Sequence, residues 1–236
     1  MPGWRTPMGR YHFDERYREH ARLADGRDVR LRMIKPEDKP LFVEALKRLS
    51  PASRYARFLS AKSSLSQGEL RYLTELDGRD HFALGALTGL GRERRGLGVA
   101  RFVRLHDEPD VADAAIVVTD DAQGQGLGRL LFLRLVAAAR ERGVDRFRCD
   151  VLAENDRMRA LLHEIAPAAR DQPDGVAVTV DVPLLDVAVD APSIPGVRGP
   201  LYRLFSLAAT GVLRVLRTRE GLRSLLAGDA HSGRKR

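Results

Sequence analysis

The stretch Gln123-Gly124-Gln125-Gly126-Leu127-Gly128 follows an apolar run, Ala114 to Val118, and precedes a long apolar segment that ends near Arg142. We expect a strand, a glycine-rich turn and a helix in this order. Glycines let main-chain N–H groups approach a ligand without obstruction by side chains. The N-terminus of a helix adds unpaired N–H groups and a partial positive charge. This segment therefore predicts a cradle for a phosphate or pyrophosphate group.

Three kinds of phosphate cradle can be compared with this turn. A P-loop ends in Gly-Lys-Ser/Thr, whereas an arginine and a leucine follow Gly128, which excludes a P-loop. A dinucleotide-binding turn reads Gly-x-Gly-x-x-Gly, with an acidic residue about 20 positions later. Gly128 comes one position early for that pattern, but Asp145 and Asp150 lie near the required distance, so this alternative stays open. The third kind, Gln/Arg-x-x-Gly-x-Gly/Ala, is matched from Gln123 to Gly128 at every position.

Apolar periodicity predicts the remaining elements of an α/β (α+β) fold. Strands are expected at 28–34, 81–87, 97–105, 112–118, 146–152 and 175–185, and helices from Pro36, from Ser50, at 66–76, at 127–142 and at 155–165. The helix from Ser66 carries a capping-box spacing with Glu69. Short loops join the strands between 81 and 118, so these strands should pair antiparallel.

Composition divides the chain into three parts. Residues 1–27 are polar and rich in arginine, and we expect an N-terminal arm or partly ordered extension. A short helix at 13–24 is an alternative for part of it, although its apolar stripe is thin. Residues 28–186 are expected to form the main domain. Residues 187–236 begin with a Pro/Gly-rich linker, followed by an amphipathic helix at 201–216 and a basic tail. The broad apolar face of this helix should pack on the main domain or on a second copy of the chain, and an anionic membrane surface is the alternative.

The overall composition limits the classes of partner. The chain has 236 residues, 44% of them hydrophobic and 31% charged, and lacks the run of about 18 apolar residues that a membrane span needs. The N-terminus lacks the apolar stretch of a secretory signal, so we expect a cytoplasmic protein. The single cysteine, Cys149, is expected to be a small buried hydrophobe, and no spacing typical of a metal site is present. Arginines are scattered and not interleaved with aromatic residues, so no nucleic acid partner is expected despite a net charge of +8.

The turn and the order of elements between residues 29 and 185 resemble the GNAT superfamily of N-acetyltransferases. The stretches Leu49–Phe58, Val99–Val103 and Asp150–Asn155 are similar to the GNAT domains of bacterial protein lysine acetyltransferases. The resemblance implies a mixed, mostly antiparallel twisted sheet flanked by helices, with acetyl-CoA as the acyl donor. It also implies a protein lysine as the acceptor, with a small amine as the next candidate.

The resemblance assigns a cofactor site around the turn. Main-chain N–H groups of the turn would hold the CoA pyrophosphate, and the strand at 114–118 would separate from the strand at 146–152. The pantetheine arm would then add to the exposed backbone like an extra strand, with N–H groups near Val117 and Val118 polarising the thioester carbonyl. Asn155 either contacts the arm or caps the following helix. The cofactor-binding residues expected in this way are Val117, Val118, Gln123, Gly124, Gln125, Gly126, Gly128, Arg129 and Asn155.

The catalytic chemistry requires removal of a proton from an ammonium acceptor before its nitrogen attacks the thioester. Asp113 occupies the position at which lysine-acetylating relatives carry a glutamate, and we expect it to be the general base. Many family members protonate the leaving thiolate with a tyrosine, but Leu162 lies in that position here. His163 is a second candidate for this proton transfer and otherwise a helix-surface residue. These departures leave a CoA-binding sensor with little turnover as an alternative function.

Overall fold

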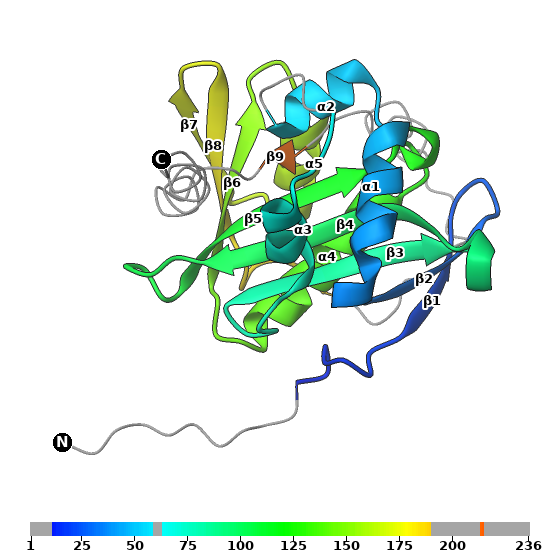
Figure 1. Cartoon of the computed structure of the whole chain (residues 1–236). Helices are drawn as coiled ribbons and strands as arrows, with labels where there is room; N and C mark the ends of the chain where they lie inside the picture. Colours follow the sequence, from blue (N-terminus) through cyan, green and yellow to red (C-terminus); the bar gives the residue numbers. More distant parts are fainter. Residues whose placement is uncertain (1–10, 59–62, 190–212, 215–236) are drawn as a thin grey trace, which may run out of the picture.

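The computed structural model describes residues 11–58, 63–189 and 213–214 (Figure 1). Eight of its strands form a continuous sheet in the order β1-β2-β3-β4-β5-β6-β8-β7, and a ninth strand, β9, pairs with β6. Neighbouring strands are antiparallel, except for the parallel pair β5 and β6. The strands are β1 (Glu19–Arg22), β2 (Asp28–Met33), β3 (His81–Thr88), β4 (Arg95–Arg104), β5 (Val111–Val118), β6 (Arg146–Leu152), β7 (Arg170–Asp174), β8 (Ala177–Pro183) and β9 (Leu213–Arg214). The helices are α1 (Lys39–Arg48), α2 (Pro51–Phe58), α3 (Gln67–Thr74), α4 (Leu127–Arg140) and α5 (Asp156–Ile165).

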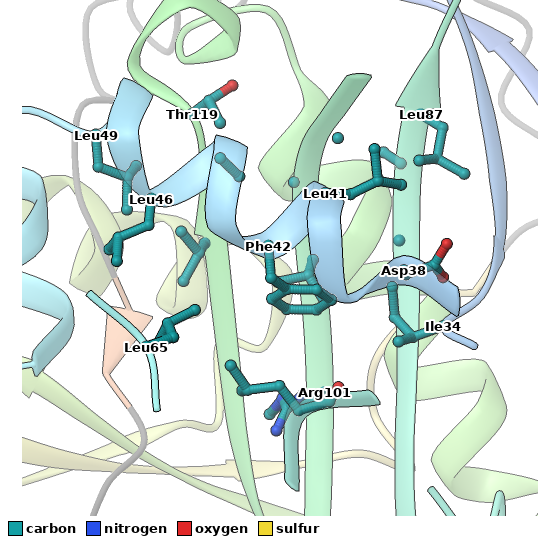
Figure 2. A pocket seen from close by; sticks show the side chains of 18 residues that line it. Ile34, Asp38, Leu41, Phe42, Leu46, Leu49, Leu65, Leu87, Arg101 and Thr119 are labelled. Carbon is teal, nitrogen blue, oxygen red and sulfur yellow. Dashed lines mark hydrogen bonds between the residues drawn. The ribbon is translucent and has the colours of Figure 1, made fainter. Parts of the chain in front are cut away.

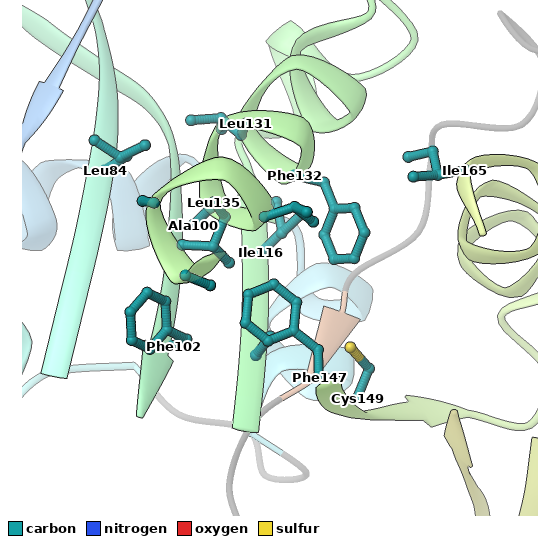
Figure 3. Packing of buried hydrophobic residues seen from close by; sticks show 14 of the residues in the cluster. Leu84, Ala100, Phe102, Ile116, Leu131, Phe132, Leu135, Phe147, Cys149 and Ile165 are labelled. Carbon is teal, nitrogen blue, oxygen red and sulfur yellow. The ribbon is translucent and has the colours of Figure 1, made fainter. Parts of the chain in front are cut away.

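Helices cover both faces of the sheet. In Figure 1, α1 and α3 lie in front of strands β3 to β5, and α4 lies behind them. Side chains alternate along β5, so Ile116 faces α4 and belongs to a core that also contains Phe132 of α4 and Phe147 of β6 (Figure 3). The rings of Phe132 and Phe147 are 5.9 Å apart and pack edge to face. Asp113 and Val117 consequently point to the opposite face, beneath α1 and α3.

Most elements expected between residues 28 and 165 are confirmed. The helix after Ser66 begins with the expected capping box, because Glu69 N–H donates to Ser66 Oγ at 3.2 Å and Ser66 N–H donates to Glu69 Oε2 at 2.8 Å. The strand expected at 175–185 is β8, and it forms a hairpin with β7, which was not expected. The sequence of β7, Arg-Asp-Gln-Pro-Asp, shows no apolar alternation, because this strand lies at the edge of the sheet and is largely exposed.

The short helix considered at 13–24, a stretch that the structure describes in full, is not present. Residues 19–22 form β1, which pairs antiparallel with β2. Glu19 accepts hydrogen bonds of 2.6 and 2.7 Å from the guanidinium of Arg134 on α4. The guanidinium of Arg142 lies 4.2 Å from the ring centroids of both Tyr11 and Phe82. Sheet pairing and buried arginines therefore fix this segment, although its sequence pattern is polar.

The C-terminal helix expected at 201–216 lies almost entirely outside the described residues. Its two described residues, Leu213 and Arg214, form β9 and pair antiparallel with Val151 and Asp150 of β6. For these two residues the expected helix is wrong. Among the described residues, no helix is both long and apolar enough to cross a membrane.

Candidate active site

The parallel strands β5 and β6 separate in the middle of the sheet. They pair only from Val111 to Asp113 on β5 and from Arg146 to Arg148 on β6. Further along, β6 pairs with β9 rather than with β5. This is the separation that the sequence led us to expect, and it begins immediately after Asp113.

The register of β5 decides which main-chain groups face this separation. Thr119 N–H donates to Leu97 O at 2.8 Å, and Leu105 N–H donates to Val111 O at 2.9 Å. Because these bonds alternate along an antiparallel pair, odd-numbered residues of β5 direct their N–H groups to β4. Even-numbered residues, Ile116 and Val118 among them, direct theirs to the side from which β6 separates. We call this the open side, although Leu213 and Arg214 of β9 lie near β5 there.

The main-chain N–H groups of Val117 and Val118, which the sequence analysis named as donors, point in opposite directions. Val118 has its N–H on the open side, whereas the N–H of Val117 belongs to the β4 ladder. Ile116 is a donor that sequence reasoning missed, because only the strand register reveals which of two neighbouring residues faces outward.

The glycine-rich turn reverses the chain between β5 and α4. Gly124 and Gly126 have φ angles of 73° and 83°, a left-handed region that residues with a side chain rarely adopt. Gly126 caps α4, and its carbonyl accepts the first helical bond from Leu130 N–H at 3.1 Å. The N–H groups of Leu127, Gly128 and Arg129 precede this ladder and project from the helix end. The turn thus has the conformation and donors of an anion cradle.

Gln123 and Asp120 connect this turn to the opposite face of the sheet. Gln123 Nε2 donates to Val118 O at 3.1 Å and lies 3.4 Å from Asp120 Oδ1. Asp120 also accepts from Ser50 N–H at 2.7 Å and from Ser53 Oγ at 2.6 Å, both at the start of α2. These contacts show that the Gln123 side chain orders the turn. They also explain the Ser-Pro-x-Ser pattern at Ser50, which anchors α2 beside the cradle.

Two other expected cofactor contacts have partners within the protein. Arg129 Nη1 lies 2.8 Å from Glu164 Oε1 on α5, so its guanidinium forms an exposed ion pair. Asn155 Oδ1 accepts from Met158 N–H at 3.1 Å and caps α5. The main-chain N–H of Arg129 stays in the first turn of α4 and remains a candidate donor to the pyrophosphate.

Asp113 is a buried carboxylate next to the point where β5 and β6 separate. Its side chain is 7% exposed, and its Oδ2 atom has no hydrogen-bond partner among the described residues. Burial, reinforced by the negative charges of Asp150 and Glu108, raises the pKa of Asp113 to about 7, while Arg148 acts in the opposite direction. A carboxylate with a pKa near neutrality can accept a proton at physiological pH.

The residues considered for protonating the thiolate lie on α5 and β6. Leu162 is fully buried in the core and has no proton to transfer. His163 Nε2 lies 2.8 Å from Asp171 Oδ1 of β7, which fixes the imidazole at the surface. Cys149 is buried, and burial raises the pKa of its thiol, so it is the small core residue that we expected.

Comparisons with known proteins agree with this arrangement. The Acetyltransferase (GNAT) family matches residues 51–165. The chain is 32% identical to acetyltransferase PA5475 of Pseudomonas aeruginosa over 64% of this chain and 81% of that protein. It is 33% identical to acetyltransferase Pat of Mycolicibacterium smegmatis over 70% of this chain but only 49% of that protein, so it spans about half the length of this relative.

A solved structure supports the same relationship. The GNAT domain of S. lividans PAT superposes with a TM-score of 0.63 at 26% identity, covering 70% of this chain and 96% of that domain. The identity to the Pseudomonas protein, which the chain covers over most of its length, and the family match extend across the glycine-rich turn and Asp113. The chain therefore belongs to the GNAT family of acetyltransferases.

Proposed function

We propose that this acetyltransferase transfers the acetyl group of acetyl-CoA to the side-chain amine of a protein lysine, by direct attack in a ternary complex. The family assignment favours acetyl-CoA over the dinucleotide that the turn had left open. The lysine acceptor is supported by the stretches similar to protein lysine acetyltransferases and by the relatives named Pat and PAT. Residues 28–186, together with the segment from Tyr11 that packs on them, would be the catalytic unit.

The cradle is suited to the CoA pyrophosphate. Gly126 leaves open space where a Cβ atom would stand, and the N–H groups of Gly128 and Arg129 lie before the helical ladder of α4. The positive end of the α4 dipole adds to this attraction for an anion. The pantetheine arm would run from the turn along the open side of β5, and it would take the place that β9 has beside β6 in this structure. There the N–H groups of Ile116 and Val118 would donate to the arm and to the thioester oxygen.

Asp113 is the observation that carries the catalytic proposal. With a pKa of about 7, it is partly ionised at neutral pH and can take a proton from the acceptor ammonium, directly or through one water molecule. The neutral amine then attacks the thioester carbonyl, the C–S bond breaks, and the negative charge passes to the CoA sulfur. The nitrogen releases its second proton to water as the amide forms, and, because Leu162 has no proton to give, the thiolate takes its proton from water. The amide and free CoA are the products.

The test is release of free CoA from acetyl-CoA in the presence of mixed lysine peptides. We expect release above the hydrolysis background from the wild-type chain and a loss of at least about 100-fold in the Asp113→Asn variant. An Asp121→Asn variant is the matched control, because Asp121 is an exposed aspartate near the turn, paired with Arg27 and Arg48.

The outcomes separate the candidate functions. Release with small amines but not with peptides would replace the protein acceptor by a small molecule. Binding of acetyl-CoA without any release would overturn the enzymatic proposal in favour of a CoA-binding sensor. Full activity in Asp113→Asn would remove Asp113 as the base.

A further inference from the structure

A cavity lies beneath α1, on the same face of the sheet as Asp113. Its floor is formed by β3, β4 and β5, and its roof is α1 (Figure 2). Phe42, Leu46 and Leu49 project into it from the roof, Leu65 lies at one side, and Leu73 also lines it. Among the residues that the structure describes, the lining contains three polar side chains, those of Asp38, Arg101 and Thr119.

A glycine in the floor accounts for part of the space. Gly96 of β4 lies beneath α1 and carries no side chain that could fill the gap between helix and sheet. A Cβ atom at Gly96 would meet Leu41 Cβ at an ordinary 3.9 Å, so no steric conflict requires a glycine there. At Gly85 of β3, by contrast, a Cβ atom would meet Ile34 Cδ1 at 2.6 Å, so the side chain of Ile34 already covers the sheet at that position.

The three polar side chains of the lining have protein partners. Asp38 forms a buried ion pair with Arg32, with an N–O distance of 2.6 Å. Thr119 Oγ1 donates to Leu97 O at 3.1 Å. Arg101 Nη2 donates to Leu73 O at 2.8 Å, and its Nη1 lies 3.3 Å from His81 Nε2. Because these groups are already paired, the space that remains suits an apolar occupant.

The cavity reaches β5, the strand beside which the thioester is proposed to lie. Val117 lines it, and this residue lies between Ile116 and Val118, whose N–H groups face the open side of β5. A group that crosses β5 from its open side to the face beneath α1 spans about 5 Å, the width of one strand. An acyl chain attached to the thioester carbonyl would make this crossing, whereas the pantetheine arm leaves in the direction of the cradle.

We propose that this cavity holds the acyl chain of the thioester, and that the protein accepts saturated acyl groups of three to five carbons in addition to acetyl. This proposal rests on the proposed function, because it takes the thioester to lie beside Ile116. Each methylene group transferred into the cavity should tighten binding about fourfold. Butyryl-CoA, with two more methylene groups than acetyl-CoA, should therefore bind about 15-fold more tightly.

The experiment is calorimetric titration of the whole chain with CoA, acetyl-CoA, propionyl-CoA, butyryl-CoA and succinyl-CoA. Succinyl-CoA has the four acyl carbons of butyryl-CoA but ends in a carboxylate. We expect affinity to rise from acetyl to butyryl and to fall again for succinyl. If succinyl-CoA bound as tightly as butyryl-CoA, Arg101 would be recognising an anion and the apolar assignment would be overturned.

Variants of α1 locate the effect. Ala45→Phe places a phenyl group in the cavity, and butyryl-CoA should then lose its advantage over acetyl-CoA. Lys47→Phe adds the same group to the exposed side of α1 and should keep the 15-fold difference. If Ala45→Phe does not fold, as judged by thermal unfolding, Gly96→Ala narrows the floor with less disturbance and should reduce the difference.

Two results would overturn the inference in distinguishable ways. Equal binding of all acyl-CoA compounds, with CoA itself bound, would refute the acyl cavity and leave the proposed function intact. Failure of CoA and of every thioester to bind would refute the cofactor site, and the acyl cavity with it.

Discussion

Replacing Asp113 by asparagine should make the protein more stable at pH 8 while it removes activity. The pKa of Asp113 is raised from 3.8 to about 7, chiefly by burial. An acid with a raised pKa in the folded state favours folding while it is protonated, and this contribution is lost as the pH rises through the folded pKa. Asparagine is neutral and of similar shape, so it avoids the cost of a buried charge at every pH.

The size of the effect follows from the two pKa values. The shift of the pKa from 3.8 to about 7 means that ionisation of Asp113 lowers the free energy of unfolding by about 4 kcal/mol in total, at roughly 1.4 kcal/mol for each pH unit. Linkage places roughly 2.5 kcal/mol of this between pH 5 and pH 8, where the carboxylate ionises in the folded protein. The free energy of unfolding of Asp113→Asn should therefore exceed that of the wild type by a margin that widens by this amount over the same range.

Urea denaturation followed by circular dichroism at pH 5, 6, 7 and 8 measures this margin in both proteins. Asp121→Asn is the control, because a hydrogen bond with Thr119 and the charges of Arg48 and Arg27 lower the pKa of Asp121, and its replacement should not produce a widening gain. The kinetic counterpart is the pH profile of kcat/KM, whose rise near pH 7 should be absent from Asp113→Asn. A constant margin from pH 5 to pH 8 would refute the buried, protonatable carboxylate and with it the assigned base.

Three further changes test the cradle. Gly126→Val should abolish acetyl-CoA binding in calorimetry because it opposes a φ of 83°, while Gly143→Val, with a comparable φ of 71° outside the cradle, should keep it. Asp120→Ala releases α2 and the glycine-rich turn from each other, and the Kd for acetyl-CoA should rise roughly tenfold, as expected for about one lost hydrogen bond to a charged group. Arg129→Ala should change this Kd by less than about twofold and the stability by less than 1 kcal/mol, because the guanidinium pairs with Glu164 at the surface; a larger loss in titration would show that it contacts a phosphate instead.

Local patterns in the sequence were sufficient for most of the fold. The capping box at Ser66 and the apolar alternation of β3 to β6 each depend on neighbouring residues, so they can be read without knowledge of distant contacts. β1 and β7 were missed because they are short, polar edge strands whose stability comes from pairing with β2 and β8. Apolar alternation along the sequence cannot reveal a strand of this kind, because the strand has almost no apolar residues to alternate.

The candidate site shows the same limit at the level of single residues. The glycine-rich turn and Asp113 were found because their residue types and spacing carry the information. The choice between Val117 and Ile116 as a donor needs the β4–β5 register, which depends on residues more than ten positions away. The raised pKa of Asp113 likewise comes from burial by the assembled sheet and from Asp150 on a strand distant in sequence.

The contacts made by Arg142 determine where a shortened version of this enzyme can begin. Its guanidinium donates to the main-chain oxygens of Gly78, Ala138 and Phe13, all within 2.8 Å, and it lies against the ring of Tyr11. Truncation at residue 28 would strip away the aromatic ring and one of these oxygens, and would expose β2 as a bare edge. A fragment meant for crystallisation or assay should therefore retain the chain from Tyr11 onward, because the polar N-terminal segment completes the core of the catalytic unit.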